Sequence, residues 1–340
     1  MTASVVVQTS FLGDTILTTP LLAQLAHRGP VDVVTTPAAA SVLQGHPAVR
    51  QVIVYDKRDT HAGLIGFLTM RARLKQGQYD SAYLAQGSMR SALLVWAARI
   101  PERIGFATSS GSRLYTTRVA YRDDLHHAAR LLLLSRPNGR EPTDEEMRPS
   151  LAPGAAERAV VDELLRSSGV RAGERLIALA PGSVWGTKRW PYYPQLAQAL
   201  ADAGRIVIVG GPGDRALAKD ILSAVPNAVD ATDKLPLLAS AELIGRSAVI
   251  VTNDSAPLHL ASAMGTPTVA IFGPTVPQFG FGPLALTKAT LGHETLACRP
   301  CHRHGPKRCP LTHFKCMREL SVEGVAERTR DLFLNPDARV

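Results

Sequence analysis

The stretch AVIVTNDSAPLHLASAMGTPTVAIFGPT, residues 248–275, decides how this chain folds. Its β-branched run Val249–Val251 is typical of a strand that is buried on both faces. An apolar helical segment follows, in which Pro257 suits the first turn and Gly265 suits the end. The second apolar run, Thr268–Phe272, predicts another buried strand. The stretch therefore predicts a strand–helix–strand unit of a parallel sheet.

Four polar side chains gather where this helix is expected to begin: Asn253, Asp254, Ser255 and His259. A helix N-terminus needs one capping side chain, so four exceed that need. In open α/β sheets, ligands bind at the C-terminal ends of strands, where a helix N-terminus attracts anions. The sequence therefore predicts a ligand site here. The alternative is that Asp254 and Ser255 are only helix caps.

Strand-like and helix-like segments alternate through both halves of the chain. The clearest strand-like runs are residues 5–7, 31–34, 81–84, 176–179 and 206–209. The proline-rich, acidic stretch 141–154 interrupts this alternation and marks the expected domain junction. We therefore expect an α/β protein of two Rossmann-like domains, 1–150 and 151–340, the second ending in a terminal helix. The cleft between the two domains is the expected active site.

The composition is that of a soluble globular protein: 340 residues, 45% hydrophobic and 20% charged. No apolar run approaches the roughly 20 residues that span a bilayer, and the start does not resemble a signal peptide, so we expect a cytoplasmic protein. The net charge of +9 suggests an acidic partner such as nucleic acid, anionic lipid or a phosphorylated substrate. Only 5% of the residues are aromatic, which argues against base stacking and makes nucleic acid the weaker choice.

Two further features allow a functional and a structural interpretation. Asp14 follows the first predicted strand, where it could line a ligand site or simply cap a helix. The helix-like segment 64–74 is apolar and carries Arg71, Arg73 and Lys75 at its end. Such a helix could touch a membrane surface, but more often it packs on a sheet with its dipole complemented.

Four stretches together resemble glycosyltransferase family nine, the lipopolysaccharide heptosyltransferases: TSFLGD (9–14), AQGSMRSALLVWAARIPERIGF (85–106), PGSVWGTKRWP (181–191) and 252–273. The segment 298–316, CRPCHRHGPKRCPLTHFKC, resembles the heptosyltransferase II branch. The resemblance implies the GT-B fold, two Rossmann-like domains with parallel sheets facing across a cleft. The implied activity is transfer of heptose from ADP-heptose to a lipid A–Kdo–heptose acceptor with inversion, at the cytoplasmic face of the inner membrane. This implies peripheral contact with that membrane.

The resemblance also implies roles for single residues. Asp14 matches the general base for the acceptor hydroxyl, and Lys188 matches the cation beside the departing diphosphate. Donor binding is implied for Ser183, Asp214, Leu235, Asp254, Ser255, Ala256 and His259. Among these, Leu235 would lie by the adenine, and Asp214 stands where relatives often have a longer Glu. The resemblance further implies that arginines of the N-terminal half, Arg90 and Arg113 in particular, bind the phosphates and carboxylates of the acceptor.

The sequence offers one candidate metal site, a group of four cysteines near the C-terminus. The chain contains no Asp-x-Asp motif, which fits a transfer that requires no cofactor and in which Lys188 and a helix dipole hold the diphosphate. Cys298, Cys301, Cys309 and Cys316, with the spacing C-x2-C-x7-C-x6-C, could bind a structural zinc ion or remain reduced thiols in a compact loop. Two alternatives to heptose transfer therefore remain: a related transferase with another nucleotide sugar or acceptor, and a basic, zinc-stapled nucleic-acid-binding protein.

Overall fold

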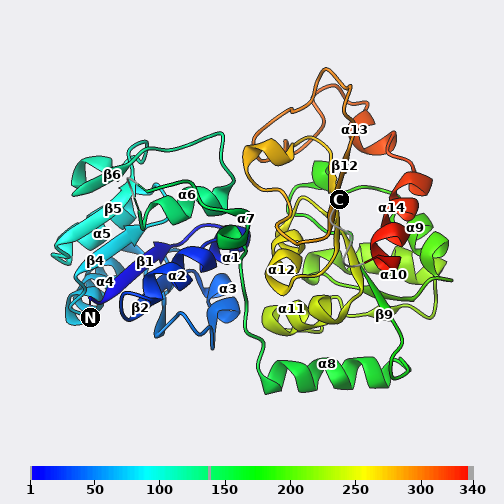
Figure 1. The fold of residues 1–340 in the computed structure, drawn as a ribbon, viewed down its shortest axis with the longest axis horizontal. Helices are drawn as coiled ribbons and strands as arrows, with labels where there is room; N and C mark the ends of the chain where they lie inside the picture. Colours follow the sequence, from blue (N-terminus) through cyan, green and yellow to red (C-terminus); the bar gives the residue numbers. More distant parts are fainter. Residues whose placement is uncertain (1, 137–138, 336–340) are drawn as a thin grey trace. The chain divides into compact units, whose positions relative to one another are not determined.

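The structure is a computed structural model that describes residues 2–136 and 139–335 (Figure 1). It divides into two compact units, Met1–Ala152 and Pro153–Val340. In the described part of the chain, no helix combines the length and the apolar composition needed to cross a membrane.

The N-terminal unit is built on a parallel sheet of six strands in the order β3-β2-β1-β4-β5-β6. The strands are β1 (Ser4–Gln8), β2 (Val31–Thr35), β3 (Gln51–Val54), β4 (Ser81–Leu84), β5 (Glu102–Phe106) and β6 (Thr117–Val119). The central strands β1, β2 and β4 are buried along their whole length. Helices therefore cover both faces of this sheet, as parallel sheets require.

The helices of this unit are α1 (Leu12–Leu17), α2 (Thr19–Ala26), α3 (Pro37–Ala40), η1 (Ser41–Leu43), α4 (Gly63–Gln76), α5 (Met89–Ala97), η2 (Ser112–Leu114), α6 (His127–Leu133) and α7 (Asp144–Met147). Helices α4 and α5 share one core with the sheet, in which Met70 and Val95 pack near Val5 and Val7. Helices α1, α2 and α6 contact one another in a separate group.

The C-terminal unit repeats the same plan. Its six parallel strands lie in the order β12-β11-β10-β7-β8-β9. They are β7 (Leu176–Ala180), β8 (Arg205–Ile208), β9 (Val229–Asp230), β10 (Val249–Asn253), β11 (Thr268–Phe272) and β12 (Lys288–Gly292). Within each unit the first and fourth strands are neighbours, which is the Rossmann order. The point between those two strands is where such sheets bind ligands.

The helices of the C-terminal unit are α8 (Ala155–Ser167), η3 (Gly186–Lys188), α9 (Tyr193–Leu200), η4 (Pro212–Asp214), α10 (Arg215–Ala224), α11 (Leu237–Arg246), α12 (Ala256–Met264), η5 (Pro277–Phe279), α13 (Lys315–Arg318) and α14 (Val322–Leu334). One core joins α9, α10 and α14 to the sheet through Leu196, Ile221 and Val325. Helix α11 contacts both α8 and α12.

The strand–helix–strand prediction for 248–275 is confirmed by β10, α12 and β11. Pro257 lies in the first turn of α12, and Gly265 ends the helix in the left-handed conformation, with φ at 72°. The predicted strand Thr268–Phe272 has the bounds that the structure gives β11. The α/β class with two Rossmann-like, parallel-sheet units is confirmed as well.

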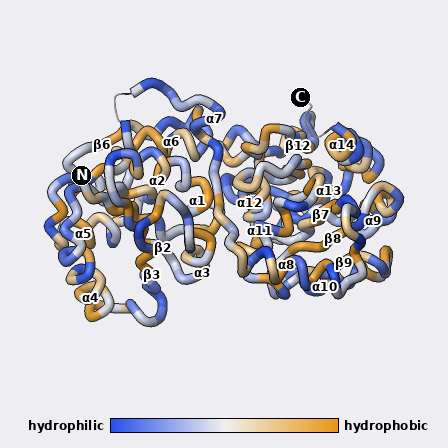
Figure 2. Tube along the Cα trace, turned by 60° about the horizontal axis from the view of Figure 1, so that its bottom comes forward, coloured by the Kyte–Doolittle hydropathy of each residue, from blue (hydrophilic) through white to orange (hydrophobic). Residues whose placement is uncertain are grey.

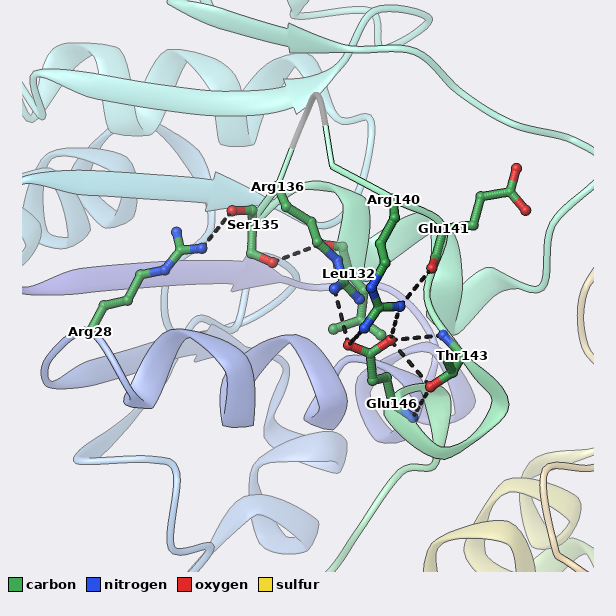
Figure 3. A network of polar contacts seen from close by, with 8 residues as sticks. All are labelled: Arg28, Leu132, Ser135, Arg136, Arg140, Glu141, Thr143 and Glu146. Carbon is green, nitrogen blue, oxygen red and sulfur yellow. Dashed lines mark hydrogen bonds and ion pairs between the residues drawn. The ribbon is translucent and has the colours of Figure 1, made fainter.

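The stretch 141–154 differs from the sequence prediction, because it contains the short helix α7. A reciprocal capping box starts this helix: Thr143 accepts from the Glu146 N–H, and Glu146 accepts from the Thr143 N–H. Arg136 and Arg140 also donate to the Glu146 carboxylate, at 3.0 and 2.9 Å (Figure 3). Hydrogen bonds from Arg136 first, then from Thr143 and Arg140, lower the pKa of Glu146 to about 2. This network holds one helical turn where the composition favours a loop.

Candidate active site

In the C-terminal unit, the loops that follow β7 and β10 are tied together by Asn253. This last residue of β10 is fully buried. Its side-chain amide donates to the Pro181 carbonyl at 2.9 Å, and its Oδ1 accepts from the Trp190 N–H at 3.2 Å. Asn253 therefore fixes both ends of the 181–190 loop against the neighbouring strand. Its role in the structure is to position that loop.

Lys188 and Asp254 form an ion pair at this position. The Lys188 Nζ lies 2.6 Å from Asp254 Oδ2, and each side chain is only 11% exposed. The same carboxylate oxygen accepts from the Thr275 hydroxyl at 2.7 Å. The pair thus joins the loops after β7, β10 and β11, three neighbouring strands, at the point where a Rossmann sheet binds its ligand.

The start of α12 lies beside this ion pair. Ser255 is the N-cap residue, but within the described chain its side chain makes no capping hydrogen bond. Its hydroxyl instead lies 3.4 Å from the Asn253 carbonyl. Ala256 is the first helical residue, and His259 is buried in the second turn with its ring near Phe281. The Asp254 carboxylate contacts Lys188 and Thr275 instead, so neither side chain serves as a helix cap. The N–H groups of Ser255 and Ala256 can therefore bind an anion.

Asp214 approaches the same loop from the end of β8. Its carboxylate accepts from the Gly211 N–H at 3.0 Å, and it lies so close to Gly182 that a Cβ there would stand 2.3 Å from its carboxylate carbon. Arg189, which donates to the Ser183 carbonyl, lies 3.9 Å from Asp214. Ser183 is buried and Asp214 half-buried, so both sit in the wall of the loop.

Leu235 lies further along, in the turn between β9 and α11, and is half-buried. It is therefore on the same C-terminal side of the sheet as Asp214, after a strand that β7 and β8 separate from β10. The structure thus distributes the predicted donor residues along the C-terminal strand ends from β10 to β9.

The segment 298–316 packs onto the candidate donor site. The Arg299 guanidinium donates to the carbonyls of Phe272, the last residue of β11, and of Gly273 and Thr275 in the loop that follows. Thr187 donates to the Pro306 carbonyl, and a Cβ at Gly305 would stand 3.1 Å from Lys188 Cε. This basic segment therefore supports the loop that carries Lys188.

The zinc hypothesis for this segment gains no support. Among residues 2–136 and 139–335, no group of three or more His, Cys, Asp or Glu is arranged to hold a metal ion. All four cysteines are free, and the Cys301 thiol donates to the Cys298 carbonyl at 3.1 Å. Burial raises the pKa of Cys301, and it raises the pKa of Cys316 to about 11.

In the N-terminal unit, Asp14 lies in the first turn of α1, just after β1. The N-cap of that helix is Phe11, so the alternative of Asp14 as a helix cap is wrong. Asp14 Oδ2 accepts from the Ser10 hydroxyl at 2.7 Å. Its side chain helps to line a cavity of about 470 Å³, together with Ser10, Gln86, Tyr121 and His127. This cavity lies at the ends of β1 and β4, the corresponding ligand-binding point of the first sheet.

His127 is the titratable side chain that lies beside Asp14 in this cavity. Its Nε2 lies 3.6 Å from Asp14 Oδ1, and the residue is buried at the start of α6. Burial lowers the pKa of His127, the Asp14 charge raises it, and Arg130 lowers it, so the net shift is downward. The imidazole is therefore neutral at pH 7 and leaves the carboxylate of Asp14 without a cationic partner at that position.

The two arginines expected to contact the acceptor lie outside the lining of this cavity. Arg90 donates to the Tyr55 hydroxyl at 2.8 Å and to the carbonyls of His61 and Gly63. Its guanidinium also lies over the Tyr55 ring, 5.5 Å from the ring centre. Arg113 is exposed in η2. The structure therefore does not bring Arg90 and Arg113 together with Asp14.

The sequence did not indicate four residues that shape these sites: Ser10, His127, Thr275 and Arg299. Ser10 lies inside the quoted TSFLGD motif and Thr275 ends the stretch 248–275, so position in a motif could have indicated both. Arg299 lies inside the quoted segment 298–316, so its position could have indicated it as well. His127 lies outside the quoted stretches, and only the fold brings it to Asp14.

Comparison with known proteins gives the family. The family model described as glycosyltransferase family 9 (heptosyltransferase) matches residues 67–311. The chain is 28% identical over 291 residues to lipooligosaccharide heptosyltransferase 2 of Haemophilus influenzae, covering 79% of this chain and 83% of that protein. It is 33% identical over 175 residues, 49% of this chain, to lipooligosaccharide heptosyltransferase 2 of Campylobacter jejuni, and spans about half (53%) of that protein's length. The alignment with a second C. jejuni lipooligosaccharide heptosyltransferase 2 covers 52% of the length of that relative.

The fold agrees with these relatives. The structure of Escherichia coli ADP-heptose lipopolysaccharide heptosyltransferase II superposes with a TM-score of 0.78 at 23% identity, over 99% of this chain and all of that one (100%). Two tandem Rossmann-like units of this kind define the GT-B class of glycosyltransferases. The chain belongs to glycosyltransferase family 9. This leaves the nucleic-acid-binding alternative without support.

Proposed function

We propose that this protein is an inverting glycosyltransferase that moves heptose from ADP-heptose to a lipid A–Kdo–heptose acceptor in the inner core of lipopolysaccharide, in the manner of heptosyltransferase II. Membership of family 9 and relatives named heptosyltransferase 2 support this proposal. The single observation that carries it is the buried Lys188–Asp254 pair beside the start of α12, at the ligand-binding point of the C-terminal sheet.

The donor chemistry follows from that pair. Cleavage of the sugar–phosphate bond leaves negative charge on the ADP diphosphate, and a fixed cation stabilises that charge as it grows. Lys188 has three N–H donors, of which Asp254 takes one, so the remaining donors can hold diphosphate oxygens. The N–H groups of Ser255 and Ala256 add the positive end of the α12 dipole. Lys188 and this helix then do the work of a divalent ion, and no cofactor is required.

The remaining donor residues hold the sugar and the nucleoside. Asp254 and His259 are placed to accept from or donate to heptose hydroxyls, because both lie at the start of α12. Ser183 faces phosphate from the loop after β7. Asp214 and Leu235 lie along the strand ends towards β9, where a ribose and an adenine would follow the diphosphate.

The acceptor chemistry falls to Asp14. Its carboxylate accepts the proton of the acceptor hydroxyl while that oxygen bonds to the anomeric carbon and the bond to ADP breaks. Proton transfer to Asp14, formation of the new C–O bond and cleavage of the bond to ADP complete the reaction without a covalent sugar–enzyme intermediate. This direct displacement inverts the anomeric configuration. Neutral His127 and the Ser10 hydroxyl position the carboxylate. Arg90 and Arg113 are proposed to hold acceptor anions, Arg90 while it keeps its contact with Tyr55.

A second candidate is a related family member that uses another nucleotide sugar or acceptor. The observation that favours it is Asp214, which is shorter than the Glu expected at the ribose. A screen of ADP-, UDP- and GDP-linked sugars with a heptose-terminated core acceptor, monitored by release of nucleoside diphosphate, separates the two. Turnover with ADP-heptose above the other donors supports the proposal. Turnover with a UDP- or GDP-sugar alone contradicts it.

A further inference from the structure

Two neighbouring helices of the N-terminal unit, α4 and α5, expose an unusual amount of apolar surface. Among the described residues, thirteen large hydrophobic side chains are exposed, and six of them lie on these two helices. They are Leu64 (72% exposed), Ile65 (81%), Leu68 (46%), Met89 (45%), Leu93 (40%) and Trp96 (53%). Both helices already bury another face in the core through Met70, Leu74 and Val95. The core therefore does not bury these six residues, which are here called the outer face.

Two arginines show how the helices are aligned. At one end, Arg90 of α5 donates to the carbonyls of His61 and Gly63, where α4 begins. At the other end, Arg71 of α4 donates to the Ala97 carbonyl, where α5 ends, at 3.0 Å. The helices therefore run side by side in the same direction. Figure 2 shows both at the periphery of the N-terminal unit, with orange and blue residues on α4.

The exposed stripes of the two helices border one depression of about 630 Å³. Its lining includes Arg71 from α4 and Trp96 from α5, followed by Arg99 and Arg103. On α4, Leu64 and Leu68 lie on the same side as Arg71, because residues three or four apart share a helix face. On α5, Met89 and Leu93 share the face of Trp96 for the same reason. The apolar stripes therefore lead into a depression lined by three arginines.

The charged side chains of the two helices have a single sign. Helices α4 and α5 contain Arg71, Arg73, Lys75 and Arg90 and no acidic residue. Apolar side chains that enter the acyl region, a tryptophan at the boundary and cations at the level of lipid phosphates are the features of a membrane-surface helix.

We infer that the outer face of α4 and α5 docks on an anionic lipid bilayer, with a lipid phosphate taken into the depression formed by Arg71, Arg99 and Arg103. This inference deepens the proposed function, since it assigns a surface to the contact with the membrane that carries a lipid-borne acceptor. Charge complementarity selects an anionic bilayer as the occupant. The side chains of Leu64 and Ile65 enter the lipid, and Arg73 and Lys75 remain at the headgroups.

The test measures binding of the full chain to sedimented vesicles of phosphatidylethanolamine and phosphatidylglycerol, with phosphatidylcholine vesicles as the neutral comparison. We expect binding to the anionic vesicles only, weakening with salt. The double variant Leu64→Ser/Ile65→Ser loses about tenfold in vesicle affinity, because two exposed side chains no longer partition into lipid. Arg73→Glu/Lys75→Glu also loses about tenfold or more, because four units of charge change at the surface.

Two matched control variants carry the same kinds of substitution at exposed positions of the C-terminal unit. Val160→Ser/Leu334→Ser removes exposed apolar side chains, and Arg171→Glu/Lys219→Glu changes the same number of charges on exposed positions. Both controls are expected to bind vesicles like the unaltered protein. Equal losses for test and control pairs, or equal binding to neutral vesicles, would overturn the inference. So would a change of oligomeric state in Leu64→Ser/Ile65→Ser without vesicle binding, which would show that the occupant is a second copy of the chain.

An activity measurement separates this inference from the proposed function. With the acceptor presented in vesicles, Leu64→Ser/Ile65→Ser should raise the apparent Michaelis constant for acceptor about tenfold, with unchanged turnover on a deacylated, water-soluble acceptor. Loss on both acceptors alike would contradict a docking role. Vesicle binding that persists without any heptose transfer would leave the docking surface standing and overturn the proposed function alone.

Discussion

The Lys188 ammonium lies 2.6 Å from the Asp254 carboxylate, and both side chains are only 11% exposed. The resemblance implies diphosphate binding for the lysine and sugar binding for the aspartate, and the structure shows that the two side chains form one ion pair. Removal of charged groups from water is costly, and a pair with a further hydrogen bond from Thr275 offsets that cost. The pair therefore holds a cation in place before any ligand arrives, which is what electrostatic catalysis requires.

Replacement of the lysine should separate its catalytic role from its structural role. In Lys188→Met, turnover should fall by about 10²–10³-fold, the scale for loss of one preorganised donor, while ADP affinity falls much less. Stability should also fall by about 3 kcal/mol, because the Asp254 carboxylate stays buried without its cation. Steady-state kinetics, ADP titration and thermal unfolding measure the three effects.

The control is the double variant Lys188→Met/Asp254→Asn, which removes both charges. Its stability should recover most of the loss, and its turnover should stay low. Recovery of turnover together with stability would mean that Lys188 acts only as the partner of Asp254.

Asp14→Asn should lower turnover by about 10²–10⁴-fold, the usual scale for removal of a general base. Asn keeps the size of the side chain and can still accept from the Ser10 hydroxyl, so ADP affinity and the unfolding temperature should hardly change. Single-turnover kinetics with saturating acceptor measure the chemical step. Ser10→Ala is the matched control and should cost much less. Near-normal turnover by the Asn variant would remove Asp14 from the mechanism.

Gly182→Ala should weaken donor binding more than it slows turnover. The added Cβ would stand 2.3 Å from the Asp214 carboxylate, which the Gly211 N–H holds in place, so the carboxylate must shift. We expect the Michaelis constant for ADP-heptose to rise about tenfold, the effect of one lost hydrogen bond to a charged group. Gly186→Ala is the control in the same loop, because its Cβ would meet nothing within 4 Å. Equal effects of the two variants would argue against a donor-binding role for Asp214.

His127 should make the protein less stable on the acid side of neutrality. Burial lowers its pKa below the usual 6.5, so below that pH the unfolded chain binds a proton that the folded protein does not. The free energy of unfolding therefore falls as the pH drops from 6.5 towards the folded pKa. The variant His127→Gln lacks this titrating group. The difference in free energy of unfolding between the unaltered protein and the variant should therefore become smaller as the pH is lowered from 8 to 5. His46, whose pKa is also lowered, is present in both proteins and cancels. A constant gap would contradict a neutral, buried His127.

Much of the fold could be predicted because local sequence and tertiary structure agree. In the stretch 248–275, the apolar runs, Pro257 and Gly265 each favour the structure that forms. Helix α7 was missed because its stability comes from Arg136 and Arg140 as well as from its own capping box. The composition of 141–154 carries no sign of those two arginine contacts.

The candidate site could be predicted only in part. Motif positions indicate Asp14, Lys188 and Asp254, which lie at the ligand-binding points of the two sheets. The contact of Lys188 with Asp254 spans 66 residues, and the contact of His127 with Asp14 joins α6 to α1. Spacing within a motif reports neighbours along one segment, so pairs of this kind become visible only when the sheet order is known.

The most direct test of heptose transfer is the product itself. The protein is incubated with ADP-heptose and a heptose-terminated core acceptor, and the new linkage is identified by NMR together with the amount of ADP released. We predict one heptose added per ADP released, with an anomeric configuration opposite to that of the donor. A retained configuration would contradict direct displacement with Asp14 as the base. ADP release without a new heptose linkage would contradict the proposed function.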